Sequence, residues 1–237
     1  MPVTDQRMSV LGIINEVRKK VKLNAVTTVD GDSDSVIKLG YLNDIVSMVS
    51  DYGNWQESLR TITVTAQSSV AAYSLSSAAF TQLGITVIQN VHSVFYEGYT
   101  SEMRLIELDQ MRRLQRLPNY GFPTQWCVNG VDDDGNPIIS VAPIPVSAQQ
   151  GGIMTVNLYE KEPFYTTADG ATVVPYPGKL IVQGLLTATI LDESDGEPTQ
   201  RYQMNQAIFD NMLNETYNRY NGDSGSTIFF RPARGRR

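Results

Sequence analysis

Apolar and polar residues alternate through the middle of the chain, between residues 121 and 164. This period of two is typical of strands that bury one face. The turns are also marked, because Asp134-Gly135 favours a tight hairpin and the Pro-Ile-Pro run at 143–145 cannot continue a ladder. Gly151-Gly152 then precedes a third alternating run. The segment therefore predicts three antiparallel strands forming one half-buried sheet.

Both ends of the chain show helical periodicity instead. Before residue 56, apolar residues recur every three or four positions over 4–22 and 35–52, which predicts two helices. Near the C-terminus, residues 179–191 are apolar on almost every face, and 199–220 carry a broad apolar stripe. We expect the helix over 179–191 to be the most buried of the four.

The polar loop at residues 30–34 carries three spaced aspartates, as the start of a calcium-binding loop does. The rest of that pattern fails, because Ser35 stands where the sharp turn needs glycine and Tyr41 where the bidentate glutamate belongs. We therefore interpret the segment as a loop that caps the following helix.

Shorter strand-like runs occupy 59–64, 73–75, 85–96 and 104–108, and a basic helix follows Asp109. Its arginines could face a phosphate backbone, but their spacing among apolar residues favours the solvated side of an amphipathic helix. The arginines are Arg112, Arg113 and Arg116.

The order of helices, strands and helices, without βαβ alternation, predicts an α+β fold. We expect a small helical bundle built from residues 1–56 and 177–220, with an antiparallel β-sandwich or barrel-like domain inserted at 57–176. Residues 221–237 are expected to form an extended C-terminal tail, since a Gly/Ser-rich stretch separates them from the last helix.

Composition gives no indication of a membrane protein, and nothing in the sequence argues for secretion. Hydrophobic residues make up 41% of the 237, enough for a core, but no run approaches the roughly 18 apolar residues of a membrane span. The N-terminus carries no apolar signal segment. Net charge is −6, yet the last seven residues contain four arginines and no acid, so residues 1–230 hold 15 basic against 25 acidic residues. A basic tail on an acidic body suits an acidic or phosphate-bearing partner.

Candidate chemistry is sparse. The single histidine, His92, and the single cysteine, Cys127, both fall in predicted strands, where they are expected to be structural rather than ligating or reactive. The phosphate-binding, nucleophile-elbow and zinc-protease motifs are missing. Carboxylates could form a glycosidase-like pair, but solvated strand ends are the favoured interpretation. These carboxylates are Glu102, Glu107 and Asp109, or Glu160 and Glu162. We expect no enzyme, no cofactor and no metal.

Several short motifs together resemble the head-to-tail adaptor (connector) proteins of tailed bacteriophages, especially short-tailed ones. Two N-terminal helices lead to Trp55 in DYGNWQESLRTITV, and the centre carries GFPTQW, GNPII, APIP and VNLY. A VPYP segment then opens the apolar helix IVQGLLTATIL, which is followed by a helix rich in Phe, Leu and Tyr. The resemblance covers most of the chain.

The resemblance implies a structural virion protein, assembled in the host cytoplasm, that forms a ring commonly of twelve copies. The ring would dock under the portal, carry the next tail component and surround a channel through which DNA passes. The C-terminal segment would then contact the portal. The implied portal-binding residues are Ile228, Phe229, Phe230, Arg231, Arg234, Arg236 and Arg237.

Two alternatives stay open at this point. A carbohydrate- or receptor-binding β-domain of a phage tail would present exposed aromatic residues in a groove, with Tyr73, Tyr96 and Tyr99 as candidates. A carboxylate-dependent hydrolase would instead rely on one buried acid among the carboxylates named above.

Overall fold

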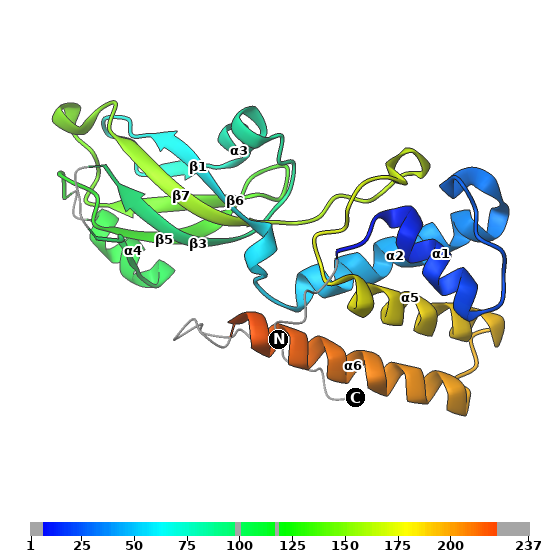
Figure 1. The fold of residues 1–237 in the computed structure, drawn as a ribbon. Helices are drawn as coiled ribbons and strands as arrows, with labels where there is room; N and C mark the ends of the chain where they lie inside the picture. The colour runs from blue at the N-terminus through cyan, green and yellow to red at the C-terminus, as the bar shows by residue number, and fades with distance from the viewer. Residues whose placement is uncertain (1–6, 98–100, 117–118, 222–237) are drawn as a thin grey trace.

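The computed structural model describes residues 7–97, 101–116 and 119–221, and its fold is α+β, as predicted (Figure 1). The helices are α1 (Val10–Lys20), α2 (Ser33–Tyr52), α3 (Ser76–Leu83), α4 (Leu108–Arg116), α5 (Gly178–Glu193) and α6 (Gln200–Asn221). The strands are β1 (Leu59–Thr65), β2 (Ala72–Ser74), β3 (Ile88–Tyr96), β4 (Arg104–Leu105), β5 (Gln125–Val131), β6 (Pro137–Ala142) and β7 (Ile153–Glu160). Short 3-10 turns are η1 (Val29–Gly31), η2 (Gln56–Ser58), η3 (Ser147–Gln149) and η4 (Thr167–Asp169).

The strands form a two-layer sandwich that does not close into a barrel. One sheet has the order β1-β7-β3 and the other β2-β6-β5-β4. The pairings are antiparallel except for the short parallel pair between β4 and β5. One core fills the space between the layers, with Ile62 on β1, Trp126 on β5, Ile139 on β6 and Val156 on β7 all buried within it.

The central hairpin forms where the sequence predicts it. In the turn between β5 and β6, Gly135 adopts a φ of 79° and donates its N–H to the Asp132 carbonyl at 2.9 Å. Glycine is the residue that reaches this backbone region at least cost. The Asp132 side chain also accepts hydrogen bonds from the N–H groups of Asp134 and Asn136, and these bonds stabilise the turn.

The prediction of one three-stranded sheet is wrong in its third strand. β7 leaves the β5–β6 hairpin and pairs with β1 and β3 in the opposite layer. Residues 143–145 end β6, and the chain passes through η3 before β7 begins. Alternation reports that one face of a strand is buried, but a strand in either layer buries that face in the same core. The pattern therefore cannot choose between the two sheets.

The helical bundle is organised around α5, which contacts α1, α2 and α6 (Figure 1). Nearly every position of α5 from Gly178 to Ile190 is buried, so the prediction that this helix is the most buried is confirmed. Gly184 permits the close approach, because a Cβ there would lie 2.7 Å from Ile45 of α2 and 2.8 Å from Phe209 of α6.

Two local predictions need correction. The first helix begins at Val10, because Ser9 caps it by accepting the Gly12 N–H at 3.1 Å. The sequence predicts a helix from Thr4, and this is wrong for residues 7–9, which precede the helix. Residues 4–6 lie outside the described residues. The sequence interpretation also missed α3. This eight-residue helix ends at Gly84 in a left-handed conformation, and only Ala79 among its residues is buried, so it carries little periodic signal.

Candidate functional site

The predicted portal-binding residues, 228–237, lie outside the described residues, but the position of the preceding helix is described. α6 ends at Asn221, one turn after Tyr217. The Tyr217 ring is buried and packs against Trp55, with centroids 5.7 Å apart, and against Tyr52 at 5.3 Å. Helix α6 therefore reaches its C-terminus beside the connection between the bundle and the sandwich.

Trp55 occupies the centre of this connection, between α2 and η2. Its side chain is fully buried, and its indole N–H donates to the Val49 carbonyl at 2.7 Å. Its ring also meets Tyr176 edge to face at 5.5 Å. Gly53 lies beside it with no room for a side chain, because a Cβ would come 2.2 Å from the Tyr217 ring. The aromatic packing thus joins the end of α2, the segment before α5 that carries Tyr176, and helix α6.

Polar contacts join the two parts of the molecule across the same connection. Gln89 of β3 donates to the Ser50 carbonyl at 2.7 Å, and Lys161, just after β7, forms an ion pair with Asp51 at 3.0 Å. Farther along the β7–α5 connection, Asn43 of α2 bonds both backbone groups of Tyr165, at 2.9 and 2.8 Å. Bonds from the start of β3 and from the residue after β7 therefore hold the sandwich against the C-terminal half of α2.

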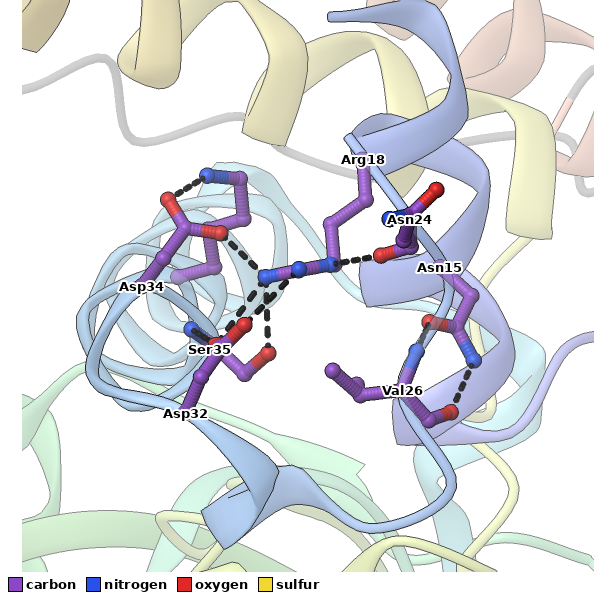
Figure 2. Close-up of polar contacts among 8 residues, drawn as sticks. Asn15, Arg18, Asn24, Val26, Asp32, Asp34 and Ser35 are labelled. Atoms are coloured by element: carbon purple, nitrogen blue, oxygen red, sulfur yellow. Dashed lines mark hydrogen bonds and ion pairs between the residues drawn. The ribbon is translucent and has the colours of Figure 1, made fainter. Parts of the chain in front are cut away.

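The aspartate loop is a structural cap (Figure 2). Asp32 accepts the N–H of Ser35 at 2.8 Å and begins α2, which confirms the capping prediction. Asp32 and Asp34 both bind Arg18 of α1, at 2.8 and 2.5 Å, although the Arg18 side chain is only 5% exposed. Hydrogen bonds from Ser35, with a further contribution from Arg18, lower the pKa of Asp32. Asp34 also pairs with Lys38, so both carboxylates are committed to cations of the protein itself.

Four side-chain amides make paired bonds to backbone that sequence reasoning missed. Asn15 bonds both the N–H and the C=O of Val26, at 2.8 and 2.9 Å (Figure 2). Asn43 does the same to Tyr165, and Gln82 to Thr63. Asn136 spans the Thr86 carbonyl and the Ile88 N–H. An amide offers one donor and one acceptor side by side, so it can replace a neighbouring strand.

The single histidine and the single cysteine both lie in strands, as predicted. His92 is exposed on β3 and meets the Tyr159 ring edge to face at 5.5 Å. Cys127 is buried with Met111 and Ala142 under α4, and burial raises the pKa of its thiol. A raised thiol pKa lowers the fraction of nucleophilic thiolate.

The candidate carboxylates differ in their surroundings. Glu102, Glu107 and Asp109 are exposed around β4 and α4. Glu160 forms an ion pair with Arg60 at 3.0 Å. Glu162 accepts a bond from the Tyr165 hydroxyl at 3.3 Å, and burial raises its pKa, with a smaller contribution from Glu160. Each of these last two acids has a local structural partner, and the burial of Glu162 differs from the solvated strand end that the sequence predicts.

Two of the three tyrosines named by the carbohydrate-binding alternative lie among the described residues, and both are buried. Tyr73 is 7% exposed and bonds the Val70 carbonyl through its hydroxyl, while Tyr96 is 3% exposed and bonds Gln149. Both rings belong to the sandwich core, and Tyr99 lies outside the described residues. The prediction that Tyr73 and Tyr96 are exposed is therefore wrong. Tyrosines in strands are readily buried when the hydroxyl group has a hydrogen-bond partner.

The basic helix is amphipathic, as predicted. Met111 of α4 is fully buried against Cys127. The three arginines of the helix are exposed, and Arg112 lies 3.9 Å from Asp109.

Across the described ranges, no helix combines the length and the apolar character that a membrane crossing requires.

Comparison with known proteins gives one family. No curated protein matches the chain. The family model described as SU10 adaptor protein, in contrast, matches residues 8–236. This range contains every helix and strand of the bundle and the sandwich, and it extends through Arg236 of the basic tail. Because the match spans almost the whole length, the chain belongs to the SU10 adaptor protein family, a family of phage head–tail adaptors.

Proposed function

We propose that this phage adaptor is a structural protein of the virion that forms a ring between the portal and the tail, with DNA passing through the ring. The observation that carries the proposal is the continuous family match over residues 8–236. The match includes the described helices and strands and most of residues 221–237, so the proposed roles of body and tail rest on the same family match. Ring assembly would take place in the host cytoplasm before the virion is complete.

Exposed apolar residues on two sides of the bundle support self-association. On α2, Val36, Ile37 and Met48 are between 42% and 52% exposed. On α6, which lies across α5 from the α1 and α2 pair in Figure 1, Met204 is 62% and Ile208 44% exposed. A ring needs two different faces on each copy, because its contacts are head to tail. Two separate apolar stripes satisfy that requirement.

The division of the chain into two domains and a tail is also a proposal. The bundle has its own core, which includes Trp55 and Tyr176, and the sandwich has a second core around Trp126. We propose that residues 1–56 with 177–220 form one domain, 57–176 the second, and 221–237 a tail that reaches the portal. The acidic body would favour passage of DNA without adhesion, because like charges repel.

Native mass measurement tests the ring directly. We expect the purified protein to form a closed ring of about twelve copies, either alone or when mixed with the portal of the same phage. A portal of an unrelated phage is the control, since specific docking requires complementary surfaces. A protein that stays monomeric with its own portal would contradict the proposal.

Deletion of residues 228–237 tests the portal contact. The segment supplies two adjacent phenylalanines and four arginines, a combination that suits apolar anchoring plus charge pairing. We expect the truncated protein to keep its unfolding midpoint, because the deletion begins seven residues after α6, and to bind the portal at least about tenfold more weakly.

Two matched variants separate the contributions to portal binding. Changing Phe229 and Phe230 to serine removes the apolar part, and changing the four arginines to glutamine removes the charge. Only the arginine variant should lose the salt dependence of portal binding, because screening acts on the charged term. Equal portal affinity for the truncated and full-length proteins would refute this role of the tail.

A further inference from the structure

Phe164 is the most exposed large apolar residue that the structure describes. Its side chain, on the connection between β7 and α5, is 71% exposed. In Figure 1 the yellow-green part of this connection lies across the bundle from α6. Covering an exposed aromatic ring lowers the free energy, and aromatic residues are enriched where proteins contact one another. Phe164 is therefore a candidate anchor for a protein–protein contact.

The backbone on both sides of Phe164 is fixed. Tyr165 is buried, and its N–H and C=O bond the side chain of Asn43 on α2 at 2.8 and 2.9 Å. On the other side, the ring of Pro163 restricts its φ, and Lys161 forms an ion pair with α2 at 3.0 Å. An anchor on a fixed backbone loses little freedom on binding, so more of the burial energy remains as affinity.

A pocket of about 440 Å³ lies between α1, α5 and α6. Met8, Val182 and Met212 form its apolar lining, and none of its lining residues among the described ranges comes from α2. Because a dry cavity of roughly 150 Å³ accommodates benzene, the pocket has room for a phenylalanine ring. Phe164 belongs to a loop bound to α2, so the anchor and the pocket lie on different sides of the bundle.

The pocket continues the exposed apolar stripe of α6. Met204, Ile208 and Met212 follow one another at a spacing of four residues, so they share one face of the helix. The first two are the exposed residues assigned above to a ring contact, and Met212 lines the pocket. The loop that carries Phe164 is bound to α2, which holds the other stripe. Each proposed contact face therefore carries one half of an anchor-and-pocket pair.

The charges around the anchor and the pocket are also complementary. Lys20 and Lys179 of the pocket are exposed, and neither forms an ion pair with another described residue, whereas Glu16 is the one acid in the lining. Residues 162–172, around Phe164, contain two acids and no basic residue. The anchor loop is thus negative and the pocket is net positive, which favours their approach.

We propose that Phe164 of one copy of this chain enters the α1–α5–α6 pocket of the next copy. The contact is head to tail, because the anchor and the pocket are different surfaces of the same molecule, and it repeats from copy to copy. This inference rests on the proposed function, in which the copies form a ring, and it names the contact that joins neighbours in that ring.

Phe164→Ala tests the anchor, with self-association of the full-length chain measured by sedimentation alone and with its portal. We expect self-association at least about tenfold weaker, because interface anchors of this kind dominate binding. The unfolding midpoint should not change, since the ring is exposed in the single copy. Phe164→Leu, which keeps an apolar side chain, should recover most of the association. Phe80→Ala, which removes an exposed ring from α3, is the matched control and should leave it unchanged.

Two neighbouring lysines test the pocket. Lys19 and Lys20 are both exposed in the last turn of α1, but only Lys20 lines the pocket. Lys20→Glu should weaken self-association about threefold, because it places a negative charge opposite the acidic anchor loop. Lys19→Glu changes the charge at the end of the helix equally and should have no such effect. Equal weakening by both variants would mean that general charge, rather than the pocket, controls association.

A photoreactive benzoylphenylalanine in place of Phe164 identifies what the anchor contacts. The substitution keeps an aromatic ring and bonds to neighbouring C–H groups on irradiation. In a mixture of isotopically light and heavy chains, we expect cross-links from position 164 to Met8 or Met212 of another copy. The same group at position 80 is the control and should give no cross-link to these two residues.

The cross-linking outcomes separate this inference from the proposed ring. A ring that persists with Phe164→Ala, and cross-links from position 164 to the portal alone or to position 164 of another copy, would overturn the contact and leave the ring untouched. A cross-link to Met212 that appears only after removal of residues 2–6 would assign the pocket of the intact chain to its own N-terminal segment, and would also overturn it. The expected cross-links in an open chain of copies would support the contact and contradict the closed ring. A monomer with no cross-link between copies, even with the portal, would overturn both.

Discussion

Replacing Trp55 by alanine should lower the free energy of unfolding by about 4 kcal/mol. The side chain is fully buried where α2 meets the connection to the sandwich. Its removal would leave a cavity beside Tyr176 and Tyr217, whose rings lie 5.5 and 5.7 Å away. The Val49 carbonyl would also lose the indole N–H that it accepts. Urea unfolding followed by circular dichroism measures the change.

Two variants serve as controls for Trp55→Ala. Trp55→Phe keeps an aromatic ring and loses the N–H, so it should cost about half as much. Phe80→Ala removes a large ring that is 62% exposed on α3 and should change stability by less than about 0.5 kcal/mol. Equal effects for Trp55→Ala and Phe80→Ala would show that the aromatic packing at the connection does not stabilise the fold.

Replacing Asp34 by alanine should lower the free energy of unfolding by about 3 kcal/mol. Asp34 lies 2.5 Å from Lys38 Nζ and 2.5 Å from Arg18 Nη1, and the two cationic side chains are only 4% and 5% exposed. Without the carboxylate, Lys38 would be a buried cation without its partner, whereas Arg18 would keep Asp32 at 2.8 Å. The cost therefore comes chiefly from Lys38.

The same loop supplies the control for Asp34→Ala. Asp30 is exposed on η1, so Asp30→Ala should change stability by less than about 0.5 kcal/mol. Asp34→Asn keeps the size of the side chain and removes the charge, and it should be nearly as destabilising as Asp34→Ala. A fully stable Asp34→Asn protein would mean that hydrogen bonding, rather than charge pairing, holds the loop.

Predictions from the sequence succeeded where the deciding interactions are local. Asp32 caps α2 through a bond to a residue three positions away, and Gly135 forms a turn within five residues. α5 is buried on nearly every face, as its composition indicates. Each of these features depends on neighbours in the chain, so spacing and residue type are sufficient to predict them.

Apart from the missed helix α3 and the start of α1, the failures concern contacts between distant segments. Strand alternation does not specify the sheet that β7 joins, since either layer buries the same face. The amide of Asn43 bonds Tyr165, 122 residues away, and no property of asparagine marks it for that partner. The candidate tyrosines Tyr73 and Tyr96 read as exposed because tyrosine is amphipathic, yet hydroxyl partners on nearby loops allow their burial.

Sequence alone was therefore sufficient for most of the elements, the α+β class and the adaptor resemblance, because these depend on periodicity, turn residues and the order of segments. The tertiary structure decided three further matters: which layer receives β7, the burial of Arg18 and Lys38 beside their aspartates, and the placement of Gln82 on the edge of β1. Each of the three depends on how close the fold brings segments that are not neighbours in the chain, and on how much water remains between them.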